Sequence, residues 1–351
     1  MIRLFEAFAG VGTQAMALKR IDIDYEVVGI SEIDKFALKS YEQIHGKVNN
    51  YGDISKINPD NLPDFDLFTY SFPCQDISMA GKQAGFGKDS GTRSSLLWEC
   101  ERIIKNKKPK YLLMENVKAL TFKKNIEGFN TWLKTLEDIG YKNYWKVLNA
   151  KDYGVPQNRE RVFCVSILGD EEYKFPEKQI LKTRLKDFLE DKVDEKYYLS
   201  NDRVRQLIKI IKDDDVIVEP KIIQTHTGGR VKQPCIPIKN STKKGYLKAY
   251  PGDGIDLINP NCKNRRGRVQ KDSIQTLTCG DNRGVVADDL RIRKLTPLEC
   301  WRLMGIDDED FYKAQKVNSD SQLYKQAGNA IVVDVLAAIF MNCLKDELIV
   351  R

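Results

Sequence analysis

The stretch Phe8–Ala15 reads FAGVGTQA and decides the fold. It follows an apolar run, Arg3–Phe8, and leads into a helical pattern, Gln14–Arg20. The stretch fits a Gly-x-Gly-x-x-Ala turn, in which glycines let the backbone approach a ligand closely. A strand that enters a helix through such a turn predicts an α/β domain with a binding site at the turn, although a tight turn without a ligand would look the same.

The alternation of apolar runs and helical patterns continues to about residue 170. We expect strands at Arg3–Phe8, Val27–Ile30, Asp66–Tyr70, Tyr111–Met114, Tyr144–Leu148 and Val162–Leu168. We expect helices at Gln14–Arg20, Lys35–His45, Ser94–Lys105 and Gly128–Ile139. This order predicts a doubly wound, mainly parallel sheet, whose sites lie beyond the carboxyl ends of the strands.

A second part of the chain has a different pattern. Residues 171–290 are rich in Lys, Gly, Asn and turn pairs, which predicts a smaller, irregular, β-rich domain. Helical patterning returns at Pro297–Met304 and Asn329–Leu344. We therefore predict a catalytic and cofactor-binding domain at 1–170, the smaller domain at 171–290, and a C-terminal segment at 291–351 whose last helix returns to the first domain.

Composition excludes several classes of protein. The 351 residues are 42% hydrophobic and 30% charged, an ordinary globular balance. We see no apolar run close to the length of a membrane span and no signal-peptide pattern at Met1–Gly10, so a cytoplasmic protein is expected. Eight cysteines without a Cys-x-x-Cys pair, together with two histidines, predict no metal site. Most of the cysteines should be small core residues.

Positive charge is concentrated in one segment. The net charge is +7, but residues 221–280 alone hold twelve Lys and Arg against three Asp and Glu. Such an excess indicates a polyanion-binding surface, although a solvated loop surface would look similar. The densest cluster consists of Lys263, Arg265, Arg266 and Arg268.

Acidic side chains recur at the ends of successive strands. Glu32 and Asp34 follow the second strand, and Asp53 precedes the third. One acid can hold ribose hydroxyls and another can accept from an adenine amino group, so together they favour an adenosine pocket. These residues suit a nicotinamide dinucleotide as well as S-adenosylmethionine. Thr13 is expected to cap the first helix.

Reactive side chains follow the next two strands. Cys74 lies in Ser71–Gln75, which reads SFPCQ, where Pro73 stiffens the approach to an activatable thiol. Glu115 follows the fourth strand, which places a carboxyl group near Cys74. Arg159 and Arg161 are two residues apart, so an extended chain would point both to one side.

Six motifs in this order resemble the C5-cytosine DNA methyltransferase family. They are Phe-Ala-Gly-x-Gly, Pro-Cys-Gln, Glu-Asn-Val, Gln-x-Arg-x-Arg, Arg-Lys-Leu-Thr-Pro from Arg293 and Gln-Ala-Gly-Asn-Ala from Gln326. The resemblance spans nearly the whole chain and implies the S-adenosylmethionine-dependent methyltransferase fold, with the basic segment inside a target recognition domain. Thr13 and Ser71 depart from that pattern at positions where glycine is common, and Ala80 departs where some members have serine.

The resemblance also implies roles for single residues. Cys74 would attack C6 of the cytosine, Glu115 would hydrogen-bond at N3 and the exocyclic amine, and Arg159 and Arg161 would position the reacting groups. S-adenosylmethionine would lie among Phe8, Ala9, Gly10, Gly12, Glu32, Ile33, Asp53, Ile54, Pro73 and Asn329. DNA contacts would include Gln75, Ser78, Lys263, Arg265, Arg266 and Arg268. The segment Gly81–Gly91 would close over a flipped base.

Double-stranded DNA is the expected partner. We expect a monomer that binds no metal and no membrane. It would belong to a restriction-modification system with an independently acting endonuclease, or be an orphan or phage enzyme. Three alternatives stay open. An RNA cytosine-5 methyltransferase would carry the same motifs, although the long recognition segment favours duplex DNA. A catalytically inactive DNA-binding relative would not need the intact set around Cys74. A dinucleotide-dependent oxidoreductase would leave the paired arginines without a role.

Overall fold

The larger domain is built on a six-stranded sheet in the order β2-β1-β3-β4-β7-β5. The computed structural model describes residues 1–74, 76–77, 93–209, 234–260, 262 and 265–344. The strands are β1 (Ile2–Ala7), β2 (Tyr25–Ser31), β3 (Leu67–Tyr70), β4 (Tyr111–Val117), β5 (Tyr141–Asn149) and β7 (Glu160–Leu168). β1 to β4 pair in parallel, whereas β7 is antiparallel to both β4 and β5, so the sheet is mixed.

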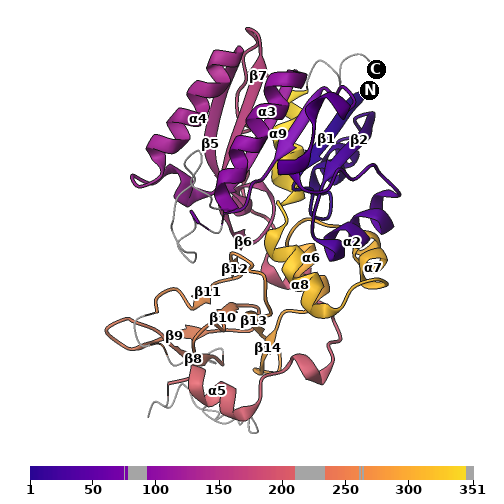
Figure 1. Cartoon of the computed structure of the whole chain (residues 1–351). Helices are drawn as coiled ribbons and strands as arrows, with labels where there is room; N and C mark the ends of the chain where they lie inside the picture. Colours follow the sequence, from indigo (N-terminus) through magenta and orange to yellow (C-terminus); the bar gives the residue numbers. More distant parts are fainter. Residues whose placement is uncertain (75, 78–92, 210–233, 261, 263–264, 345–351) are drawn as a thin grey trace, which may run out of the picture.

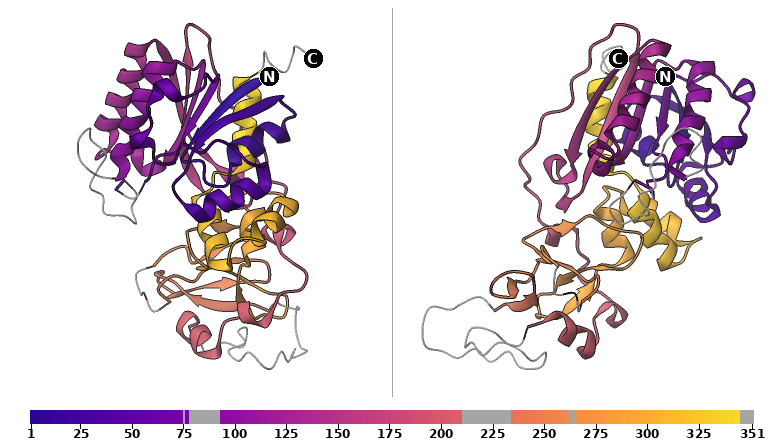
Figure 2. Two further views of the ribbon diagram at one scale, coloured as in Figure 1. Left: turned by 45° about the vertical axis from the view of Figure 1, so that its right-hand side comes forward. Right: turned by 60° about the vertical axis from the view of Figure 1, so that its left-hand side comes forward.

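Helices cover both faces of this sheet (Figures 1 and 2). They are α1 (Thr13–Arg20), α2 (Lys35–His45), α3 (Leu97–Lys107), α4 (Ile126–Ile139) and, from the end of the chain, α9 (Val333–Cys343). Alternate strand residues divide between two cores: Leu4 and Leu113 pack with α1 and α9, whereas Phe5 and Leu112 pack with α3 and α4. The period of two in each strand therefore builds both faces.

The C-terminal segment forms α6 (Pro297–Arg302), α7 (Asp308–Gln315), α8 (Asp320–Asn329) and α9. The sequence patterns missed α7 and α8 and placed Asn329 at the start of the last helix, whereas it is the final residue of α8. α9 packs against α1 of the first domain. Asp320–Cys343 nevertheless has the length and apolar composition of a membrane span, so the expectation that no run approaches that length is wrong. Since 67% of its most apolar window is buried, these are core helices, and they are weak support for a membrane.

The smaller domain carries an antiparallel sheet in the order β11-β10-β13-β14 and a hairpin of β8 and β9. The elements are α5 (Asn201–Leu207), β8 (Ile236–Lys239), β9 (Tyr246–Ala249), β10 (Gly254–Asp256), β11 (Val269–Gln270), β12 (Ile274–Gln275), β13 (Arg283–Val286) and β14 (Ile292–Lys294). It lies at the opposite end of the molecule from α4 (Figure 1). The predicted limits of the three segments remain predictions.

The two domains meet at a two-stranded parallel joint. β12 pairs with β6 (Gln157–Asn158), and Thr276 Oγ1 donates to the carbonyl of Asn158 at 2.8 Å. Gln157 is fully buried at this joint, where its amide oxygen accepts from the Leu277 N–H. The joint therefore fixes the smaller domain immediately beside Arg159 and Arg161.

Candidate active site

The loops after β1, β2, β3 and β4 line one cavity of about 320 Å³ at the carboxyl ends of the strands. All but one of the expected catalytic and cofactor residues line it, namely Phe8, Ala9, Gly10, Glu32, Ile33, Asp53, Ile54, Pro73, Cys74, Glu115, Arg159, Arg161 and Asn329. The cavity thus joins residues that are more than 300 positions apart in the sequence. The carboxyl ends of the parallel strands β1 to β4 share one edge of the sheet, and the start of the antiparallel β7 and the end of α8 reach the same edge.

Gly12 is the expected residue that does not line the cavity. It is the N-cap of α1 with a positive φ of 78°, and a Cβ there would collide with the rings of His45 and Tyr41. Gly12 therefore serves backbone conformation and packing behind the turn. Thr13, which was expected to cap this helix, does not do so, because it lies inside α1 and its hydroxyl donates to the Gln14 side chain.

Two carboxylates stand at one end of the cavity. Glu32 accepts from the backbone N–H groups of Gly10 at 2.8 Å and Asp34 at 2.7 Å, which fixes its orientation while each oxygen keeps a second lone pair. Burial raises the pKa of Glu32 against these hydrogen bonds. Asp53 accepts from the hydroxyl and the N–H of Ser55, and these bonds lower its pKa.

An apolar surface lies beside these acids. The side chain of Ile33 is 76% exposed although it lines the cavity, and Ile54 of the third loop is buried. Sequence patterns missed Lys325, which reaches the same end from α8 and pairs with Asp34 at 2.7 Å. Two acids held by hydrogen bonds, together with an exposed isoleucine in the same cavity, can hold a flat, amino- and hydroxyl-bearing group.

Cys74 lies on the loop that follows β3, at the other end of the cavity. Asn116 Nδ2 donates to the Phe72 carbonyl at 3.0 Å, and the Ser94 hydroxyl donates to the Pro73 carbonyl at 2.6 Å. These two bonds hold the approach to the thiol from opposite sides. Burial raises the pKa of Cys74 and the Glu115 charge raises it further, whereas Arg161 opposes both.

Glu115 is 7% exposed and pairs with Arg161, whose Nε lies 3.2 Å from the carboxylate. Burial raises the pKa of Glu115, and Arg161, Arg159 and a hydrogen bond from the Ser71 side chain lower it. A carboxyl group in this setting can exist in either protonation state and exchange a proton with a ligand. Glu115 does not act as a helix cap.

Arg159 is 4% exposed and is not part of a solvated loop. Its guanidinium donates to the carbonyl of Leu277 at 3.2 Å, Gly328 at 3.0 Å and Ala330 at 2.8 Å. Burial lowers its pKa to about 9. Its Nε has no hydrogen-bond partner among the residues that the structure describes, so one donor remains for a ligand.

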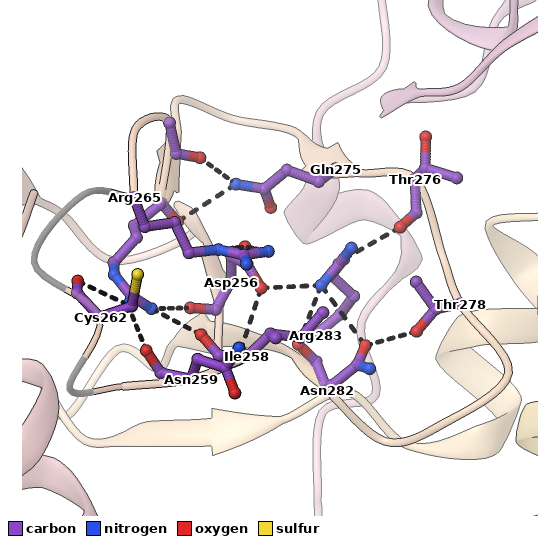
Figure 3. Close-up of polar contacts among 12 residues, drawn as sticks. Asp256, Ile258, Asn259, Cys262, Arg265, Gln275, Thr276, Thr278, Asn282 and Arg283 are labelled. Atoms are coloured by element: carbon purple, nitrogen blue, oxygen red, sulfur yellow. Dashed lines mark hydrogen bonds and ion pairs between the residues drawn. The ribbon is translucent and has the colours of Figure 1, made fainter. Parts of the chain in front are cut away.

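The basic cluster of the smaller domain contains buried and exposed side chains. Figure 3 shows Arg265 beside Asp256. Arg268 is 0% exposed and donates to the backbone carbonyls of Asp256, Ile258, Asn259 and Cys262. Its burial contradicts the expected DNA contact. Arg265 is half-buried and pairs with Asp256, whereas Arg266 is exposed. Sequence spacing could not separate these because all three carry the same charge.

The remaining DNA-contact predictions cannot be placed. Gln75, Ser78, Lys263 and the segment Gly81–Gly91 lie outside the described residues.

Five of the eight cysteines are buried, as expected. The part of the chain that the structure describes contains no group of three or more His, Cys, Asp or Glu that could hold a metal ion.

Comparisons with known proteins agree with the geometry. The family described as C-5 cytosine-specific DNA methylase matches residues 2–345. A type II methyltransferase, M2.ScrFI of Lactococcus lactis subsp. cremoris, is 41% identical over 99% of this chain and 100% of its own length. The orphan methyltransferase M.SPBetaI of Bacillus phage SPbeta is 32% identical over 98% of this chain and 97% of its own length.

Solved structures share the fold. The Entamoeba histolytica methyltransferase EhMeth aligns with a TM-score of 0.65 at 19% identity, covering 99% of this chain and 98% of that one. A putative DNA modification methyltransferase encoded within an Escherichia coli prophage gives the same TM-score and identity, with 99% of both chains covered. At this identity the likeness concerns architecture alone.

Proposed function

Since the chain belongs to the C-5 cytosine-specific DNA methylase family and is a DNA cytosine-5 methyltransferase, we propose that Cys74 is its nucleophile and Glu115 its proton donor. The observation that supports this assignment most is their placement in one cavity, where Glu115 and Arg161 form a buried pair and Cys74 stands on a braced loop. The assignment also gives Arg159 a task, since it retains a free donor there.

The cavity residues fit S-adenosylmethionine. Glu32 would accept from the ribose hydroxyls, Asp53 from the adenine amino group, and Ile33 would cover the adenine ring. The donor set supports this fit, because both acids are already oriented by backbone or side-chain donors and keep free lone pairs. When bound, this cofactor supplies an electrophilic methyl group on a positively charged sulfur.

The chain's own residues would activate the cytosine. The Cys74 thiolate adds to C6, and the electron pair displaced from the C5–C6 bond makes C5 nucleophilic. Glu115, when protonated, donates at N3 and its other oxygen accepts from the exocyclic amine, which stabilises the negative charge that forms in the ring. Arg161 holds Glu115 in place, and Arg159 contacts the base. After methylation, a water molecule takes the C5 proton, the C5–C6 double bond re-forms as Cys74 leaves as the thiolate, and Glu115 recovers its proton from N3.

Duplex DNA is the proposed substrate, with the target cytosine flipped out of the helix at a cost of a few kcal/mol. Arg266 and the basic segment around it would contact DNA, and phosphate contacts are the commoner fate of arginines. The relatives are type II and orphan enzymes, so a cognate endonuclease acting independently is one proposed context. Cytoplasmic location and a monomeric state complete the proposal.

Trapping of a covalent complex tests the assignment. Duplex DNA containing 5-fluorocytosine should form a denaturant-resistant complex with the protein in the presence of S-adenosylmethionine, because fluorine at C5 blocks the final elimination. An RNA of the same sequence should form none. Trapping of the RNA alone would identify an RNA cytosine-5 methyltransferase, and binding of a nicotinamide dinucleotide in place of S-adenosylmethionine would contradict the cofactor assignment.

A further inference from the structure

Ser71 lies beside Glu115 because of the register between β3 and β4. The strands pair in parallel with Tyr70 opposite Met114, so the next position along each strand places Ser71 next to Glu115. The Ser71 side chain lies within hydrogen-bonding reach of the Glu115 carboxylate and lowers its pKa, and both residues line the cavity. A serine hydroxyl donates to an ionised carboxylate, and it can either donate to the carbonyl oxygen of a protonated carboxyl group or accept from its O–H.

We propose that Ser71 is a positioning residue for Glu115, whose hydroxyl holds the carboxyl group toward the cytosine. This inference rests on the proposed role of Glu115. It adds a residue that none of the six motifs of the resemblance assigns to the reaction.

The loop does not depend on Ser71 for its fold. Asn116 holds the Phe72 carbonyl and Ser94 holds the Pro73 carbonyl, so the two residues before Cys74 are braced from β4 and from the turn Arg93–Leu96. Loss of the Ser71 hydroxyl leaves both bonds in place. A change at this position therefore acts on Glu115 and leaves the Cys74 loop intact.

The charged groups around Glu115 give the sign of the effect. Arg161 from β7, Arg159 from the link after β6, and Cys74 from the loop after β3 all face it. Burial raises the pKa of Glu115, while Arg161, Arg159 and Ser71 lower it. Removal of the hydroxyl takes away one of the opposing contributions, so the pKa rises and the carboxyl group keeps its proton to a higher pH.

Four variants separate the hydroxyl from its shape. Thr and Val have nearly the same shape, so Ser71→Thr and Ser71→Val compare a hydroxyl with a methyl group, and Ser71→Ala removes the hydroxyl without added bulk. The pH dependence of kcat/KM on duplex DNA is measured for each. Glu115→Gln identifies which inflection of that profile belongs to Glu115, because the inflection disappears in this variant.

We expect the Glu115 inflection to move to higher pH in Ser71→Ala and Ser71→Val but not in Ser71→Thr. kcat should fall by about 2- to 10-fold in the first two, the amount expected for one hydrogen bond, with KM for DNA unchanged. An inflection that stays in place in Ser71→Ala overturns the inference, as does equal behaviour of the Thr and Val variants. An active Glu115→Gln enzyme with an unchanged profile would instead overturn the proposed role of Glu115.

Discussion

Two carboxylates in this molecule are each flanked by two arginines, and they serve opposite purposes. Glu115, with Arg159 and Arg161, lines an open cavity. Asp256, with Arg265 and Arg283, lies 3% exposed in the smaller domain. One group of charges faces a substrate, whereas the other fastens a loop.

The difference lies in what fills the remaining hydrogen-bonding positions. Asp256 accepts from Arg265, Arg283 and the Ile258 N–H, and Arg283 continues to the Thr276 carbonyl (Figure 3). Its oxygens are thus occupied by the protein. Around Glu115, the strand ends leave a cavity in place of further backbone. Residue type therefore does not decide function here, and the surrounding backbone does.

The largest expected effect tests the cavity. Cys74→Ala should lower methyl transfer by roughly 10⁴-fold or more, because it removes the nucleophile. Cofactor binding, measured by calorimetry, should persist. Cys262→Ala, an exposed cysteine of the smaller domain, is the control and should remain fully active. If the Cys74→Ala enzyme methylates DNA at a comparable rate, Cys74 is not the nucleophile and the cavity around Glu115 is not the reaction site.

Glu115→Gln tests whether the carboxylate of the cavity takes part in the reaction. We expect kcat to fall by roughly 10²–10³-fold, in the range for loss of a general acid. Because the Glu115 charge raises the pKa of Cys74, its removal should lower that pKa. Alkylation of Cys74 by iodoacetamide, followed against pH in the free enzyme, should then reach its half-maximal rate at lower pH. A shift to higher pH would show that the two groups are not coupled as described.

Arg268 tests whether buried arginines stabilise the smaller domain. Arg268→Met should lower the free energy of unfolding by about 4 kcal/mol or more, since four carbonyls lose this donor and each buried acceptor left unsatisfied costs about 1–3 kcal/mol. Arg266→Met is the matched control on the exposed side of the same loop and should change stability little. Urea denaturation of both variants measures this. Equal stability of the two would contradict the inward role of Arg268.

The smallest effect concerns DNA. Arg266→Ala should weaken binding of duplex DNA a few-fold for all sequences and reduce the salt slope by about one unit, as for one lost phosphate contact. Affinities measured across salt concentrations with two unrelated duplexes test this. A loss of preference at a single position of the target site would indicate base reading instead. No change in either would place the DNA-binding surface elsewhere.

Much of the fold was predictable from periodicity. All six predicted strands of the first 170 residues and the helices between them form, with shifts of a few residues at their ends. The alternation of strands and helices predicted a doubly wound sheet with both faces covered, and the two cores confirm this. The sequence patterns missed α7 and α8, and they started the last helix at Asn329, whereas α8 ends there and α9 begins at Val333.

The sequence alone was enough to name the acids and the thiol that follow successive strands, from Glu32 to Glu115, since a parallel sheet brings those strand ends to one edge. The resemblance to the family added Asn329, which stands at the end of α8. Tertiary structure alone decided which charges remain available. Ser71 meets Glu115 through the register of two strands, and Arg268 turns inward because four carbonyls of its own loop surround it. Burial and hydrogen-bond saturation depend on neighbours distant in sequence, so local pattern cannot report them.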